Sequence, residues 1–177
     1  MRARSRARRL GGMSLTHAPT AFAHRHDGGE AIWHLDFLAT ILASGDETGG
    51  RLTVVEMYGP HGAGSPLHVH RREDEWFYVI EGELAIWVGG ETVRATAGSF
   101  AYAPRDIPHT FAITSSYARF LVGAEPSGFD AFVRATGTPA PARTLPPDSA
   151  SRPSPEELTA LAAERGIEIL GPPGIPS

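Results

Sequence analysis

Several residue types that carry common protein chemistry are missing from this chain. Its 177 residues include no cysteine, which excludes disulfides, thiolate nucleophiles and cysteine-bound zinc or iron–sulfur sites. All 16 basic residues are arginine, and the absence of lysine excludes Schiff-base chemistry and a P-loop lysine. Asparagine and glutamine are absent as well. The chemistry of the protein must therefore use His, Asp, Glu, Ser, Thr, Tyr, Arg, the backbone or a metal ion.

Long apolar runs and an extended basic patch are also missing. No stretch reaches the roughly 18 apolar residues of a membrane span, and no apolar run near the start has the length of a secretory signal. Five arginines lie within residues 1–12, so the rest of the chain is more acidic than the net charge of −4 and binds nucleic acid poorly. We therefore expect a cytoplasmic protein without nucleic-acid or membrane partners. Residues 1–16 are expected to be a disordered basic tail; a start at Met13, a transit peptide and a nucleic-acid arm are the alternatives.

The middle of the chain contains a series of short segments rich in β-branched and aromatic residues, each closed by Gly, Pro or Ser. Their spacing of about eight to twelve residues predicts an all-β sandwich or barrel, which we place at residues 17–126. An earlier segment, 30–44, fits either a strand or a helix, and its Ile and Thr residues favour a strand. The predicted strands lie at 51–59, 75–82, 83–90, 91–98, 99–104, 109–114 and 118–123.

The last part of the chain, residues 127–177, is expected to hold helices and a proline-rich connector. Apolar residues spaced i, i+3 and i+4 predict a short helix over 127–137. The proline-rich stretch 138–155 cannot hold regular hydrogen-bonded structure. After it, Ser154 as N-cap and Glu157 completing a capping box predict a short C-terminal helix.

Three histidines and one carboxylate have the pattern of a metal site. His68 and His70 are two residues apart, so in a strand their side chains leave the same face. Glu75 opens the next predicted strand, and His109 lies in a later one. Three imidazole nitrogens and one carboxylate oxygen are enough to hold a divalent transition metal while leaving positions open for substrate or water.

Other polar residues compete for this site. Glu73 and Asp74 stand beside Glu75 and are alternative carboxylate ligands. The second His-x-His, at 24–26, leads into a glycine turn rather than a strand, and we interpret it as a solvated loop. His34 is a candidate for a pocket wall, although a surface histidine, or a buried one with its hydrogen bonds made inside the protein, is the more ordinary interpretation.

Two stretches resemble the two sequence motifs of the cupin family. Residues 62–82 resemble the first motif and residues 98–109 the second. Asp106 stands where the second motif usually has glycine, and it still suits a turn because Asp tolerates left-handed conformations. Ile113 replaces the asparagine of germin-type members, which argues against an oxalate-oxidising function. The matching residues are Gly62, His68, His70, Glu75 and Gly82 in the first motif and Gly98, Pro104 and His109 in the second.

The resemblance implies a fold and a ligand set. It implies a cupin jelly-roll barrel of short antiparallel strands, followed by the two helices, in a single-domain cupin similar to quercetin 2,3-dioxygenases. It also implies one divalent transition metal bound by His68, His70, Glu75 and His109, with iron, manganese, nickel, cobalt, copper and zinc all compatible with these ligands. A homodimer is a further expectation at the level of the family.

The function implied by the resemblance is a metal-dependent dioxygenase that oxidises an enol or flavonol-type small molecule with O2. Glu75 would then also act as the base that takes the substrate's proton. A metal-assisted isomerase or lyase of a sugar or keto acid, and a non-catalytic cupin that binds a small molecule, are the alternatives. Phe77 and Phe111 share strand parity with the ligands and are the preferred substrate contacts, with Tyr58 as a third candidate.

Overall fold

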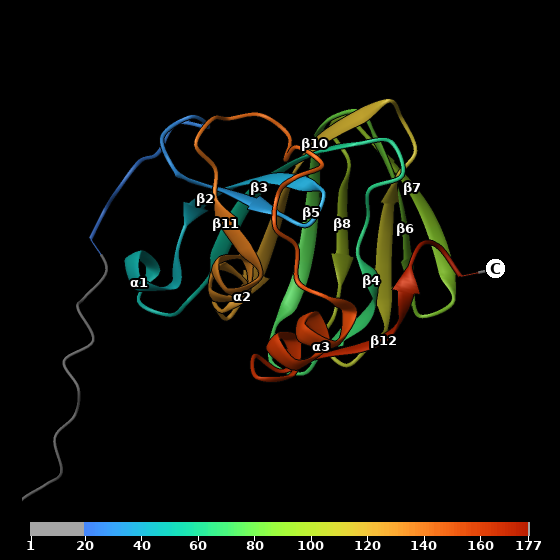
Figure 1. The fold of residues 1–177 in the computed structure, drawn as a ribbon. Helices are drawn as coiled ribbons and strands as arrows, with labels where there is room; N and C mark the ends of the chain where they lie inside the picture. The colour runs from blue at the N-terminus through green and yellow to red at the C-terminus, as the bar shows by residue number, and fades with distance from the viewer. Residues whose placement is uncertain (1–19, 177) are drawn as a thin grey trace, which may run out of the picture.

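The computed structural model describes residues 20–176 (Figure 1), so the tail predicted at residues 1–16 lies outside the described residues. No helix within this range is long and apolar enough to cross a membrane. The helices are α1 (Gly45–Thr48), α2 (Phe129–Thr136) and α3 (Pro155–Ala163). The strands are β1 (Glu30–His34), β2 (Phe37–Ala43), β3 (Thr53–Pro60), β4 (Pro66–His70), β5 (Asp74–Glu81), β6 (Glu83–Val88), β7 (Glu91–Thr96), β8 (Phe100–Ala103), β9 (His109–Ile113), β10 (Tyr117–Glu125), β11 (Gly137–Pro139) and β12 (Ile167–Pro173).

The strands form two antiparallel sheets that enclose one core. One is a 7-stranded sheet in the order β11-β1-β2-β3-β10-β5-β8, and the other is a 5-stranded sheet in the order β12-β4-β9-β6-β7. Burial alternates along β3, where Val55 and Met57 face inward, because successive side chains of a strand point to opposite faces. The all-β jelly-roll fold predicted from the sequence is confirmed. Its most buried large side chains are Phe37, Phe77, Phe120, Leu84, Ile86 and Ile113.

Two turn residues of the motifs have the backbone conformations that their positions require. Gly82 links β5 to β6 with φ 81°, and a Cβ atom there would collide with the carbonyl oxygen of Tyr117. Asp106, which replaces a glycine, takes φ 66° in the loop before β9. This is the left-handed conformation that its place in the second motif predicts.

The segment 30–44 forms a hairpin, not one long strand. β1 and β2 pair from Glu30↔Ile41 to His34↔Phe37, which leaves a two-residue turn at Leu35 and Asp36. Leu35 has φ 53°, a conformation that a non-glycine residue adopts only when its surroundings hold it there. The turn is contacted by Arg152, whose Nε donates to the Leu35 carbonyl at 3.2 Å.

The C-terminal part contains both predicted helices, but it also contains two strands that the sequence reading missed. β11 pairs with β1, and β12 pairs with β4. Residues 127–177 thus contribute strands as well as helices, and strands on both sides of residue 126 build the sheets. The Gly and Pro residues of β12 hide its strand character, and its pairing with β4 has two register shifts.

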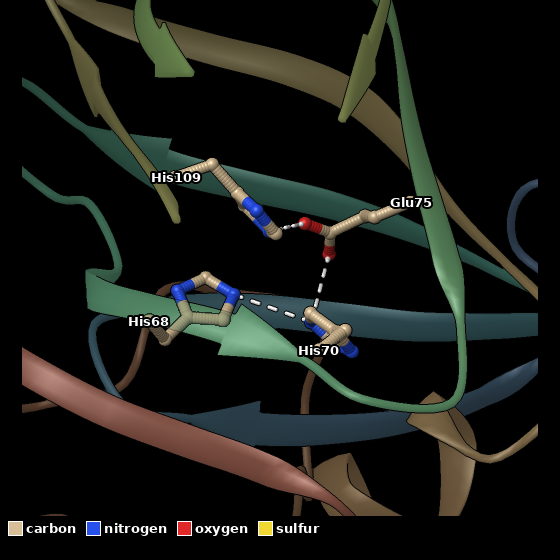
Figure 2. A group of neighbouring side chains, drawn as sticks. All are labelled: His68, His70, Glu75 and His109. Atoms are coloured by element: carbon tan, nitrogen blue, oxygen red, sulfur yellow. Dashed lines mark hydrogen bonds and ion pairs between the residues drawn. The ribbon is translucent and has the colours of Figure 1, made fainter. Parts of the chain in front are cut away.

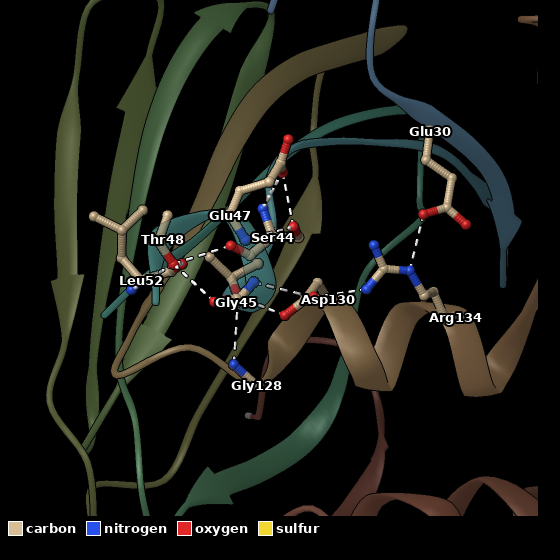
Figure 3. A network of polar contacts seen from close by, with 10 residues as sticks. Glu30, Ser44, Gly45, Glu47, Thr48, Leu52, Gly128, Asp130 and Arg134 are labelled. Atoms are coloured by element: carbon tan, nitrogen blue, oxygen red, sulfur yellow. Dashed lines mark hydrogen bonds and ion pairs between the residues drawn. The ribbon is translucent and has the colours of Figure 1, made fainter. Parts of the chain in front are cut away.

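A polar network ties α2 to the N-terminal strands (Figure 3). Asp130 accepts hydrogen bonds from Thr53 Oγ1 at 2.7 Å and from the Gly45 amide at 3.3 Å. Arg134 pairs with Asp130 at 2.7 Å and with Glu30 at 2.8 Å. These contacts hold α2 beside the open end of the barrel, where its apolar face closes the interior.

Candidate metal centre

Four side chains converge inside the barrel from three strands (Figure 2). β4 carries His68 and His70, β5 carries Glu75 and β9 carries His109, and one ligand atom of each lies within 4.8 Å of the others. The fold explains this convergence, because His68 and His109 are direct partners across β4 and β9 while Glu75 comes from the opposite sheet. All four side chains are buried. The structure thus brings together the four residues that the sequence grouped.

Backbone carbonyls fix the orientation of two of the imidazoles. His68 Nδ1 lies 2.8 Å from the Pro66 carbonyl oxygen, and His109 Nδ1 lies 2.9 Å from the Ile107 carbonyl oxygen. A carbonyl oxygen only accepts, so each Nδ1 must carry the hydrogen. In a neutral imidazole the inward-facing Nε2 then has a free lone pair.

A buried carboxylate fixes the orientation of the third imidazole. His70 Nδ1 lies 2.7 Å from Glu73 Oε2, and the two residues are 1% and 4% exposed. A carboxylate behind an imidazole orients the ring and makes its other nitrogen a better ligand. Glu73 therefore belongs to the site without being one of the four converging ligands.

The donor set fits a cation. His68 Nε2 lies 3.2 Å from His70 Nε2, and His109 Nε2 lies 2.9 Å from Glu75 Oε2. Each of these pairs brings two electron-rich atoms face to face when the imidazoles are neutral. A proton or a metal ion between them turns this repulsion into attraction, and three nitrogens with one oxygen suit a divalent transition metal.

The pKa values follow from burial and from these contacts. Burial alone raises the pKa of Glu75, but a hydrogen bond from His109 and the positive charge of the three imidazoles, both present when the rings are protonated, outweigh burial and lower it to about 2. Burial and the neighbouring His109 lower the pKa of His68 to about 3. Burial lowers the pKa of His70, but the hydrogen bond to Glu73 and the charges of Glu73 and Glu75 outweigh burial and raise it. The cluster therefore combines an ionised carboxylate with imidazoles of unequal basicity.

A small cavity borders three of the four ligands, His68, His70 and Glu75. Its volume is ≈ 50 Å³, which is room for roughly two water molecules. Two polar side chains, His34 and Ser65, join the ligands in its wall within the described residues. The remaining lining residues are apolar or glycine: Leu35, Phe37, Met57, Gly64, Pro66, Phe111, Val122, Phe129, Phe132, Leu158, Ile167 and Ile169.

Of the three predicted substrate contacts, the structure places one in the cavity wall. Phe111 lines the cavity, whereas Phe77 lies behind it in the core, with the two ring centroids 5.5 Å apart. Tyr58 does not line the cavity, and its ring lies against the exposed Tyr117 on the outside of the sheet. Tyr58 lies outside the cavity because the inward parity of β3 belongs to Met57.

The competing polar residues have other partners. Asp74 pairs with Arg105 at 2.6 Å on the surface. His24, from the second His-x-His, contacts Glu47 at 2.7 Å, far from the cluster along the chain. His34 is buried and lines the cavity, which was the alternative interpretation of this residue.

The sequence reading missed most of the cavity wall. Phe129 and Phe132 come from α2, Leu158 from α3, and Ile167 and Ile169 from β12. The apolar faces of the two helices were visible as periodic patterns, and these faces were the available signal. Their place over the metal ligands depends on the long-range pairing of β12 with β4, which no local pattern encodes.

Sequence comparisons agree with this geometry. Residues 54–123 match the family model described as "Cupin domain". Quercetin 2,3-dioxygenase from Bacillus subtilis (strain 168) is 30% identical over 111 residues, which are 63% of this chain and 33% of that protein. Quercetin 2,3-dioxygenase from Aspergillus japonicus is 28% identical over 135 residues, 69% of this chain and 39% of that protein. The chain thus spans between a third and two fifths of the length of these two relatives.

Solved structures support the same fold. KdgF from Halomonas sp. superposes with a TM-score of 0.55 at 21% identity, covering 63% of this chain and 98% of that one. An RmlC-like cupin from Shewanella frigidimarina gives a TM-score of 0.55 at 21% identity, covering 63% and 96%. The barrel, the two motifs and the match over residues 54–123 together indicate a cupin fold, in a chain that is similar to quercetin 2,3-dioxygenases.

Proposed function

We propose that this protein is a metal-dependent dioxygenase that oxidises a small enol with O2. The observation that carries the proposal is the convergence of three imidazole nitrogens and one ionised carboxylate at the inner end of an apolar cavity. The similarity to two quercetin 2,3-dioxygenases supports this reaction class over others that a cupin barrel can host.

The metal would be held by Nε2 of His68, His70 and His109 and by the carboxylate of Glu75. When bound, a divalent transition metal supplies Lewis-acid chemistry and, for redox-active ions, electron transfer. Its identity stays open among iron, manganese, nickel, cobalt, copper and zinc, since all accept such a mixed ligand set.

The residues around the cluster have separate tasks. Glu75 is ionised, as a group must be to accept the enol proton, and its carboxylate lies at the inner end of the cavity. The wall built by Phe111, Phe132 and Ile167 excludes water and keeps the reacting anion in a medium of low dielectric constant. The cavity volume of ≈ 50 Å³ is smaller than a whole flavonol.

The proposal is tested by measuring O2 consumption after loading the protein with each metal in turn. The substrates are quercetin and small 3-hydroxy-4-pyranones, which contain the same enol beside a ketone. We expect substrate-dependent O2 uptake with at least one redox-active metal and loss of at least about 100-fold in rate for Glu75→Gln. Glu91→Gln, on the exposed strand β7, is the matched control.

Three outcomes would contradict the proposal. Turnover at an unchanged rate under strict anaerobiosis would favour the isomerase or lyase alternative, in which the same ligands polarise a carbonyl group. Turnover by Glu75→Gln at the parent rate would show that Glu75 is not the base. Thermal stabilisation by a ligand without turnover would favour a binding protein.

A further inference from the structure

His34 is a buried polar residue in the cavity wall that the proposed reaction does not use. It is 3% exposed, ends β1 and lines the cavity together with three of the metal ligands, His68, His70 and Glu75. Its ring packs edge to face against Phe132 of α2, with the centroids 5.7 Å apart. A histidine in an otherwise apolar wall is costly unless its polar atoms have partners.

The hydrogen-bond partner of His34 Nδ1 fixes the tautomer of the ring. His34 Nδ1 lies 2.9 Å from Thr136 Oγ1, and that hydroxyl donates its own hydrogen to the Phe132 carbonyl at 2.7 Å. The hydroxyl can therefore only accept from Nδ1, so Nδ1 carries the hydrogen of the ring. Nε2 is then an acceptor, and it has no hydrogen-bond partner among residues 20–176.

The charge state of the ring agrees with this assignment. Burial lowers the pKa of His34 to about 4, so the ring is neutral near pH 7 and its Nε2 lone pair is available. Ser65 is the second polar side chain of the wall, and its Oγ contacts both the Phe111 amide and Thr110 Oγ1 at 3.4 Å. Ser65 Oγ is thus already engaged twice, whereas the Nε2 acceptor of His34 is left for a ligand.

We propose that Nε2 of His34 accepts a hydrogen bond from a second hydroxyl group of the substrate, separate from the enol that lies at the metal ligands. This inference rests on the proposed function and specifies its substrate class: a small, largely apolar enol with one additional hydroxyl donor. His34 and three of the metal ligands line the same small cavity, so a molecule bound at the ligands also lies near His34. His34 is then a specificity-determining residue, since a ligand that displaces water from this acceptor without supplying a donor binds more weakly.

Two 3-hydroxy-4-pyranones that differ in one hydroxyl group test this inference. Kojic acid carries a hydroxymethyl group where allomaltol carries a methyl group, and both have the enol and ketone oxygens that bind a metal ion. Their dissociation constants are measured by calorimetry on protein loaded with Zn²⁺, which is redox-inert and prevents turnover. We expect kojic acid to bind roughly three- to tenfold more tightly than allomaltol, the effect of one hydrogen bond.

Variants assign this preference to a residue. His34→Phe should bind both ligands with the affinity that the parent has for allomaltol, and His34→Leu is the second variant if His34→Phe does not fold. Ser65→Ala is the control and should keep the preference for kojic acid. Thermal melting of each variant checks the fold.

The possible failures are distinguishable. Equal affinity of the parent protein for both ligands overturns the role of His34 and leaves the enol-binding metal site standing; this comparison needs no variant. A preference that survives His34→Phe, or that disappears in Ser65→Ala alone, also overturns it. Failure of the Zn²⁺-loaded parent to bind either ligand overturns the enol site itself, and the inference falls with it.

Discussion

Nδ1 of His70 lies 2.7 Å from Oε2 of Glu73, and both side chains are buried. The other two imidazoles of the cluster donate to backbone carbonyls, so His70 is the one that faces a formal negative charge on its outer side. Glu73 and Glu75 together bring two carboxylates to the cluster, one on each side of His70. A divalent cation held there would be balanced by these two charges.

Replacing Glu73 by Gln tests the charge alone, because the amide oxygen can still accept from His70 Nδ1. We expect metal affinity to fall about tenfold, and up to about 100-fold for Glu73→Ala, which also removes the acceptor. Competition with a chelator measures the affinity. The exposed Glu91→Gln is the control, and metal affinity within twofold of the parent for both Glu73 variants would show that Glu73 serves only packing.

Replacing His109 by Ala removes one of the four converging ligands. His109 is buried in β9 but is not part of the hydrophobic core cluster, so the apolar packing is kept. Metal affinity should fall by at least roughly 100-fold, which is more than for Glu73→Gln, because a direct ligand is lost. The circular dichroism spectrum should keep its β-sheet form. His61→Ala, an exposed histidine outside the cluster, should leave affinity unchanged; equal losses in both variants would contradict the assignment.

Stability at acid pH should depend on His34. Its pKa is about 4 in the folded protein and about 6.5 in the unfolded chain. Between these values the unfolded chain binds a proton that the folded chain does not, so the free energy of unfolding falls by about 1.4 kcal/mol per pH unit as pH drops. The loss begins below about pH 6.5 and levels off below about pH 4.

The variant His34→Phe isolates this contribution, since the other histidines are present in both proteins. Denaturant titrations from pH 7.5 to 4 should show a shallower loss of stability in the variant. The difference at pH 4 should reach about 3 kcal/mol, an order-of-magnitude figure. Parallel pH profiles of the two proteins would mean that His34 is solvated or charged in the folded state.

Ile167 tests the contribution of β12 to the site. It is 4% exposed, lines the cavity and is the strand partner of His70. Ile167→Ala should lower the free energy of unfolding by about 2–4 kcal/mol because it leaves a cavity in the core. The control on the same strand is Leu170→Ala, whose side chain is exposed and whose loss should cost less than about 0.5 kcal/mol.

Strand parity explains why the four ligands could be grouped from sequence. A period of two puts His68 and His70 on one face whatever the rest of the fold does. The same rule does not place Tyr58, because parity tells which residues alternate but not which set faces inward. In β3 the inward set is that of Met57, and only the packing of the two sheets decides this.

The parts that sequence could not supply depend on contacts between distant segments. His34 reaches the cavity because Thr136, about a hundred residues later, orients its ring. β12 was hidden by its glycine and prolines, and its role comes from pairing with β4 rather than from local propensity. The expected homodimer and cytoplasmic location stay predictions.

The position of β12 also bears on when the site can form during synthesis. β4, which carries His68 and His70, has β9 on one side and β12 on the other. Until residues 167–173 leave the ribosome, β4 is an unprotected sheet edge and the cavity lacks one wall. A chain that has not yet docked β12 would therefore hold the four ligands in a barrel that is open beside His68 and His70.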